Sequence, residues 1–214
     1  MSEGQTMGKT LKIYIIEDNK QRREGIREYF QSVNRLLSGE QYDKNNDFKD
    51  CHLCFQKYQY DRIVLEEILP KKEDDENYND YKFNKRSKWV KHIERILKTD
   101  EERILLIDFA LNAKERAGLQ KSKDNFSAET TRHIVDLLNE KSTKKEYIIF
   151  ETVVKNAGKN IRGILNMKMT EKFENLSYLV MLGDYFLPWQ PVYEKVKAIS
   201  EVFEETVEKM RDGK

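Results

Sequence analysis

The stretch at 103–112, RILLIDFALN, decides the fold class, because it is an apolar run interrupted by one carboxylate. Continuous apolar runs of this length are typical of parallel strands that helices cover on both faces. Asp108 comes at the end of the run, where a strand would leave the core. We therefore expect a buried strand that carries Asp108 to the rim of a sheet.

Four further apolar runs predict strands of the same sheet. They lie at 11–18, 62–68, 146–152 and 178–184. Segments with apolar residues three and four apart separate them, as in amphipathic helices. The apolar members of the first three segments are Ile26, Phe30, Val33 and Leu37, then Val90, Ile93 and Leu97, then Ile134, Leu137 and Leu138. A weaker helical pattern spans 159–172, and the clearest spans 190–210.

This alternation of strands and helices predicts an α/β fold, a doubly wound three-layer sandwich. Right-handed crossovers then favour a five-stranded parallel sheet of order 2-1-3-4-5, which is flavodoxin-like. Two polar stretches, 38–58 and 70–86, do not fit the alternation and are expected to be insertions or long loops around the second strand. We interpret residues 1–214 as a single domain.

Composition limits the classes of partner. Charged residues make up 36% of the 214 residues, yet the formal net charge is only +1 and no sustained basic block is present, which argues against a nucleic-acid partner. No apolar stretch approaches the length of a membrane-spanning helix, and the N-terminus lacks the apolar segment of a signal peptide. We therefore expect a cytoplasmic protein without a membrane partner, and the sequence leaves homodimerisation open. Cys51 and Cys54 are expected to be ordinary reduced thiols, because a zinc site would need four ligands.

Polar side chains follow three of the predicted strands. Glu17 and Asp18 follow the first strand, Asp108 the third, and Thr152 the fourth. Function in open parallel sheets concentrates where the carboxyl ends of the strands meet the loops. Three carboxylates at one such edge would repel one another unless a cation joined them, and Mg²⁺ prefers carboxylate oxygens. The sequence therefore predicts a magnesium site there.

Several motifs together resemble the receiver domain of two-component response regulators. IYIIEDN (13–19) with the helix after it resembles that family's first strand, acidic pair and first helix, and ILLIDFALN (104–112) resembles its phosphoacceptor strand. LGDYFLPWQ (182–190) resembles its fifth strand and the proline-marked turn after it. The resemblance implies a phosphorylated signalling protein that is a substrate and a switch, not an enzyme. Its partner would be a sensor kinase or a phosphotransfer protein.

The same resemblance implies a role for each matching residue. Asp108 would accept the phosphoryl group. Glu17, Asp18 and the carbonyl of Ala110 would hold Mg²⁺ together with Asp108. The switch residues would be Thr152 and Tyr185.

One departure from the family pattern removes a positive charge. The family keeps a lysine immediately before the proline that follows strand five, where its ammonium pairs with the phosphoryl oxygens, but Leu187 stands there in this chain. Lys155 is the candidate substitute. A cation beside a phosphoryl group in a desolvated site is a strong stabilising element, so its loss predicts a weakened switch. The alternative function is accordingly a pseudo-receiver, an interaction module for an unidentified protein partner that works without phosphorylation.

The sequence also allows other interpretations. YDRIVLEEILP (60–70) also resembles a phosphoacceptor strand, with Glu66 in place of the aspartate. A haloacid-dehalogenase-type phosphatase is disfavoured because it needs a second aspartate where Ala110 stands. A Toprim nuclease is disfavoured because Asp108, Phe109 and Ala110 do not supply its Asp-x-Asp motif.

Overall fold

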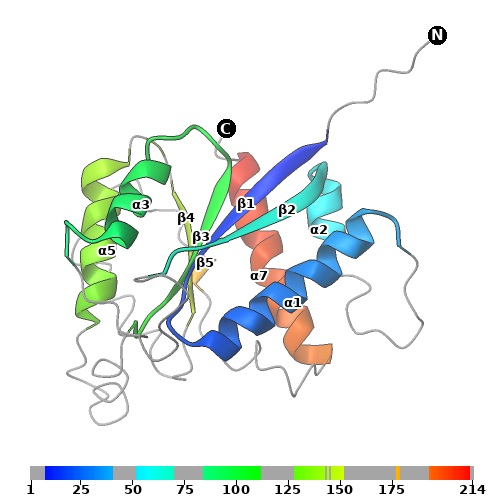
Figure 1. Ribbon diagram of the computed structural model, residues 1–214. Coiled ribbons are helices and arrows are strands. Elements are labelled where there is room, and N and C mark those ends of the chain that lie inside the picture. Colours follow the sequence, from blue (N-terminus) through cyan, green and yellow to red (C-terminus); the bar gives the residue numbers. More distant parts are fainter. Residues whose placement is uncertain are drawn as a thin grey trace.

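The structure is a computed structural model with one parallel sheet between two layers of helices (Figure 1). It describes residues 8–40, 52–69, 84–111, 128–142, 144, 146–151, 177–178 and 193–212.

Four strands form the body of the sheet, in the order β2-β1-β3-β4 and all parallel. They are β1 (Lys9–Ile16), β2 (Tyr60–Glu67), β3 (Arg103–Asp108) and β4 (Tyr147–Glu151). A two-residue strand, β5 (Ser177–Tyr178), pairs in parallel with β4. β3 is buried along its whole length, and its apolar run at 104–107 is typical of a strand with neighbours on both edges and helices on both faces.

Helices cover both faces of the sheet. On one side lie α1 (Lys20–Leu37), the short α2 (Leu53–Lys57) and α7 (Tyr193–Asp212), and on the other side lie α3 (Lys88–Ile96) and α5 (Glu129–Lys141) (Figure 1). Alternate residues of each strand supply the two cores, since successive side chains of a strand point to opposite faces. Tyr14 and Ile16 of β1 belong to the core under α3 and α5, while Ile13 and Ile15 belong to the core under α1 and α7.

The α/β class with a parallel sheet is confirmed. The predicted strands at 11–18, 62–68 and 146–152 correspond to β1, β2 and β4, and the first three predicted helices and the last one correspond to α1, α3, α5 and α7. The predicted loop at 38–58 needs a correction, because its end forms α2, whose Phe55 and Cys54 are buried. Phe55 packs against Phe30 and Phe203, so this aromatic belongs to the core. The predicted helix at 159–172, most of the stretch at 70–86 and most of the fifth strand lie outside the described residues, as does Cys51.

Within the described part of the chain, no helix combines the length and the apolar character needed to cross a membrane.

A buried ion pair ties the amino-terminal ends of β3 and β4 together. Arg103 Nε donates to Glu146 Oε2 over 3.0 Å, and Arg103 Nη2 donates to Glu146 Oε1 over 2.6 Å. Both side chains are 1% exposed. Arg103 Nη1 also donates to the carbonyls of Ile96 and Thr99, and Ser142 Oγ donates to Glu146. The pair therefore has the additional hydrogen bonds that a buried salt bridge requires, and it connects the sheet to the ends of α3 and α5.

Candidate acidic site at the carboxyl edge of the sheet

Strand register brings two of the predicted acidic positions together. Ile16 of β1 is opposite Ile107 of β3, so Glu17 and Asp108 are the next residues on neighbouring strands. The chain moves from β1 outward to β2 and then returns to the other side of β1 to form β3. This reversal makes the carboxyl ends of β1 and β3 a topological switch point, the usual location of ligand sites in open α/β sheets.

The turn after β1 fixes Glu17 and starts α1. The backbone N–H of Asn19 donates to Glu17 Oε1 over 2.7 Å. Asn19 is also the N-cap of α1, and its side-chain oxygen accepts from the backbone N–H groups of Gln21 and Arg22. Arg23 Nη1 donates to the carbonyl of Glu17 over 2.8 Å. The first turn of α1 is therefore held directly against the end of β1.

The turn after β3 is held equally well. The backbone N–H of Ala110 donates to Asp108 Oδ1 over 3.2 Å. Thr131 Oγ1, in the first turn of α5, lies 3.0 Å from the carbonyl oxygen of Phe109 and 3.3 Å from that of Asp108. Asp108, Ala110 and Thr131 are all buried. The carboxylate of Asp108 is thus positioned by its own turn and by the neighbouring helix.

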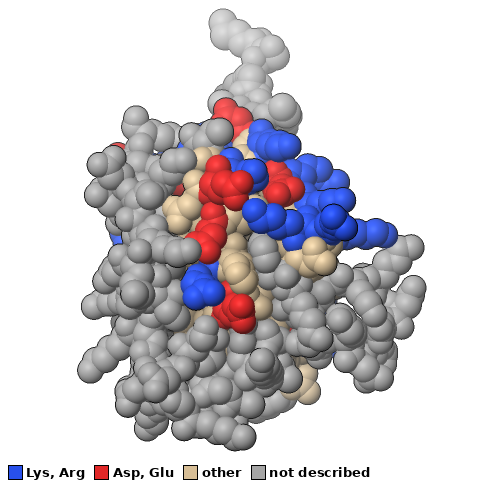
Figure 2. Space-filling model, turned by 90° about the vertical axis from the view of Figure 1, so that its left-hand side faces the viewer, with Lys and Arg blue, Asp and Glu red and all other residues tan. Residues whose placement is uncertain are grey.

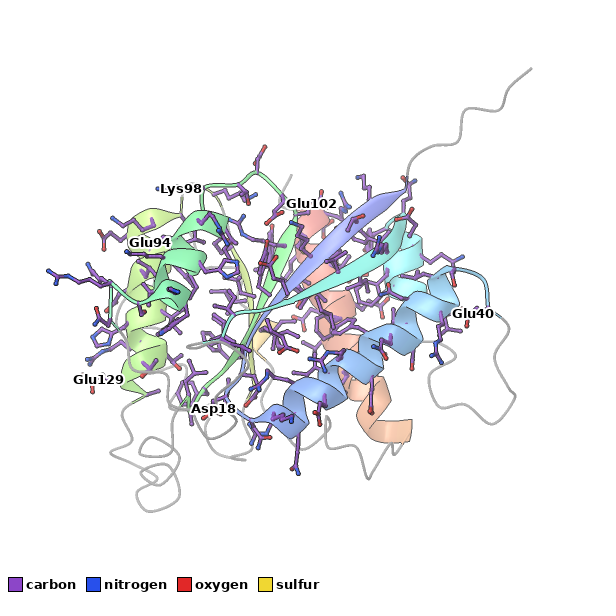
Figure 3. The ribbon with its side chains drawn as sticks, in the orientation of Figure 1. Asp18, Glu40, Glu94, Lys98, Glu102 and Glu129 are labelled. Carbon is purple, nitrogen blue, oxygen red and sulfur yellow. The ribbon has the colours of Figure 1, made fainter. Side chains whose placement is uncertain are left out.

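Glu17, Asp18 and Asp108 converge into one group of buried carboxylates, the acidic cluster. Each contributes an oxygen, and these oxygens lie within 4.8 Å of one another. The three residues are only 1–2% exposed. Figure 3 labels Asp18 at the end of the sheet where α1 begins, and Glu102, which precedes β3, at the opposite end. Glu17, Asp18 and Asp108 therefore converge in the structure, as the sequence predicts.

Arg22 lies beside the acidic cluster. Arg22 Nη1 lies 3.4 Å from Glu17 Oε2 and 3.7 Å from Asp108 Oδ2. Its side chain is 7% exposed, so the guanidinium interacts with these carboxylates in a largely water-free environment. Both distances exceed the roughly 2.7–2.9 Å of a tight charge-assisted hydrogen bond. Arg22 therefore neutralises part of the acidic cluster without closing tightly on either carboxylate.

The acidic cluster has donors that suit Mg²⁺. Carboxylate oxygens are the hard ligands that this ion takes, usually with several waters. Ligand oxygens around an octahedral Mg²⁺ are roughly 3–4 Å apart, somewhat closer than the 4.8 Å limit within this cluster. Glu17, Asp18 and Asp108 outnumber Arg22 by two charges within this group of four side chains. The donor set of the cluster therefore fits a divalent cation.

Several predicted site residues fall outside the described part of the chain. They are Thr152, Lys155, Tyr185 and Leu187. Ala110 is in place beside Asp108, with its N–H on the carboxylate. The alternative registration with Glu66 is wrong, because the described pairings put β3, not β2, between β1 and β4.

Sequence reasoning missed Arg22. A signal for it exists, since Arg22 precedes Ile26 by four residues and so continues the buried stripe of α1 through Ile26, Phe30 and Val33. A charged residue on the apolar stripe of a helix that starts at a strand end points toward that strand end.

A second feature is a basic hollow on α3. Its volume is about 360 Å³, and its lining residues are Lys88, Lys91, His92 and Arg95. His92 Nε2 lies 2.7 Å from Glu66 Oε1, whereas the three exposed cations make no ion pair to another described residue. α3 lies on the face shown in Figure 2, where Lys and Arg side chains gather beside a group of acidic ones.

Comparison with known proteins gave no match to a protein-family model, a curated protein or a solved structure. Evidence about function therefore comes from the geometry and chemistry of the chain itself.

Proposed function

We propose that this chain is a receiver-like signalling protein in which Asp108 accepts a phosphoryl group and the acidic cluster holds Mg²⁺. One observation carries the proposal: three buried carboxylates converge at the switch point of a parallel sheet, two after β1 and one after β3. In this proposal the complete sheet is five-stranded and flavodoxin-like, of order 2-1-3-4-5, and the chain is a substrate of a sensor kinase or a phosphotransfer protein.

The chemistry asked of each group is modest. Phosphoryl transfer needs an in-line nucleophile and neutralisation of the phosphoryl oxygens more than it needs covalent help from the protein. Asp108 supplies the nucleophile, and its turn holds the carboxylate in place through Ala110. Glu17 and Asp18 would hold Mg²⁺ together with Asp108, and the bound ion would supply the neutralising charge. The switch positions proposed for the phosphorylated state are Thr152 and Tyr185.

Acetyl phosphate with Mg²⁺ tests this function directly. Intact-mass measurement should detect one added phosphoryl group on the wild-type chain and none on Asp108→Asn. Asp100→Asn is the matched control, because the Asp100 side chain is fully exposed and precedes the amino-terminal end of β3, whereas the acidic cluster lies at the carboxyl end of that strand. Absence of labelling in the wild type, or labelling that persists in Asp108→Asn, would contradict the phosphoacceptor role.

The second candidate function is a pseudo-receiver, an interaction module that does not need phosphorylation. The basic hollow on α3 favours it, since Lys88, Lys91 and Arg95 are exposed cations that converge on one concave surface. Such a surface suits an acidic segment of a partner protein.

Binding of a fluorescent oligoglutamate peptide tests this second function. Wild-type protein should bind in a salt-sensitive manner, and Lys88→Glu combined with Lys91→Glu should abolish binding. Arg35→Glu is the control, because Arg35 is an exposed cation on α1, which covers the other face of the sheet. Equal loss of binding in the Arg35 variant would indicate a nonspecific charge effect and no docking surface.

A further inference from the structure

Arg22 lies beside the acidic cluster and has no counterpart among the receiver-family motifs that the sequence resembles. It extends from the first turn of α1 and is buried against the carboxylates of Glu17 and Asp108. Burying a guanidinium is costly unless its charge is compensated. The side chain of an ordinary surface arginine would extend into solvent, whereas that of Arg22 extends toward Asp108, the predicted phosphoacceptor.

The two oxygens of Asp108 have different neighbours. Oδ1 accepts from the backbone N–H of Ala110 at 3.2 Å. Oδ2 faces Arg22 Nη1 at 3.7 Å, which is within ion-pair range but too long for a tight hydrogen bond. The guanidinium is thus close to Oδ2, and it is a planar group that carries several N–H donors.

We infer that Arg22 supplies the positive charge that the chain lacks at Leu187, and that its guanidinium pairs with the phosphoryl oxygens once Asp108 is phosphorylated. This role rests on the proposed function. In the transfer step, an oxygen of the Asp108 carboxylate bonds to the phosphorus of acetyl phosphate. The phosphorus–oxygen bond to acetate breaks, and acetate leaves with the electron pair. The product carries three phosphoryl oxygens beside the planar donors of Arg22, an arrangement that guanidinium groups recognise well.

The same geometry predicts a cost for metal binding. A guanidinium beside Glu17 and Asp108 repels a divalent cation held by those carboxylates. Removing Arg22 should therefore strengthen Mg²⁺ binding and weaken phosphorylation at the same time. Damage to the local structure would instead weaken both, so opposite changes identify a direct electrostatic role.

The test compares Arg22→Met with wild type by two measurements. Mg²⁺ titration followed by NMR should give an affinity about tenfold or more higher in Arg22→Met, and labelling by acetyl phosphate at saturating Mg²⁺ should be about tenfold or more lower. Arg22→Lys should restore part of the labelling, because the charge returns without the planar donors. Arg27→Met is the control, since Arg27 lies on the same helix but pairs with Glu67.

Distinct outcomes separate this inference from the proposed function. Equal labelling of wild type and Arg22→Met, with Asp108→Asn unlabelled, would overturn the role of Arg22 and leave the phosphoacceptor in place. Parallel loss of Mg²⁺ binding and labelling in Arg22→Met would also overturn it. Failure of the wild type to label would overturn both.

Discussion

Replacing Asp108 by asparagine should stabilise the fold in the absence of divalent cations. The substitution is nearly isosteric, and the side-chain oxygen can still accept from the backbone N–H of Ala110. What changes is one negative charge in the acidic cluster, where Glu17 and Asp18 repel it and the neighbouring Arg22 attracts it. The effect on stability therefore follows from the balance of repulsion and attraction at that position.

The magnitude can be worked from the distances among these four side chains. At the 4.8 Å limit between carboxylate oxygens, each repulsion is about 3.5 kcal/mol with an effective dielectric constant of ~20. The attraction between Asp108 and Arg22 at 3.7 Å is about 4.5 kcal/mol on the same basis. Losing two repulsions and one attraction gives a net gain of roughly 2.5 kcal/mol in the free energy of unfolding.

Urea unfolding at pH 7.5 with a chelator is the assay. Asp108→Asn should raise the unfolding midpoint with an unchanged slope, which identifies a change in stability alone. The control, Asp100→Asn, should remain within about 0.5 kcal/mol of wild type, as exposed substitutions do. Saturating Mg²⁺ should stabilise the wild type and reduce the difference. A loss of 1 kcal/mol or more in Asp108→Asn would refute the electrostatic reasoning.

Three further predictions concern the rest of the fold. Glu146→Gln should cost about 3–5 kcal/mol in urea unfolding, because the buried Arg103 loses its counter-charge; a cost below about 1 would contradict this. Burial is the largest cause that raises the pKa of Tyr14, and the hydrogen bond to Glu101 is the second. The contribution of Tyr14 to the free energy of unfolding is therefore fully present below pH 10.0 and decreases as the pH rises above that value. Tyr14→Phe should flatten that alkaline decline in pH-dependent unfolding. Phe55→Ala should lower the free energy of unfolding by about 3–5 kcal/mol, and a decrease below about 1 kcal/mol would mean that α2 is not part of the core.

The parts of the fold that the sequence predicts are those with a strong apolar period. The unbroken run before Asp108 has few alternatives to a buried strand, and the stripe of α1 has few alternatives to a covering helix. Once the strands are parallel, their carboxyl ends meet at one edge. The convergence of Glu17, Asp18 and Asp108 then follows without any knowledge of side-chain positions.

The features that sequence reasoning missed are charged or weakly patterned residues whose burial depends on tertiary partners. In the sequence, Arg22 resembles any arginine on a helix surface. Its burial becomes clear only from the structure, in which Asn19 caps α1 and the Arg22 side chain lies beside Asp108 of β3. Arg103 is the first residue of β3, and only its pairing with Glu146 across the sheet makes its burial favourable. Such long-range pairs are absent from hydropathy patterns.

Beryllofluoride binding is the most direct test of Asp108 as a phosphoacceptor, because this compound imitates a phosphoryl group on a carboxylate. ¹⁹F NMR of the wild-type chain with beryllofluoride and Mg²⁺ should give a bound resonance that disappears on removal of Mg²⁺ and in Asp108→Asn. Asp100→Asn should retain it. No bound resonance in the wild type, or one that survives in Asp108→Asn, would contradict the proposal that Asp108 is a phosphoacceptor beside a magnesium site.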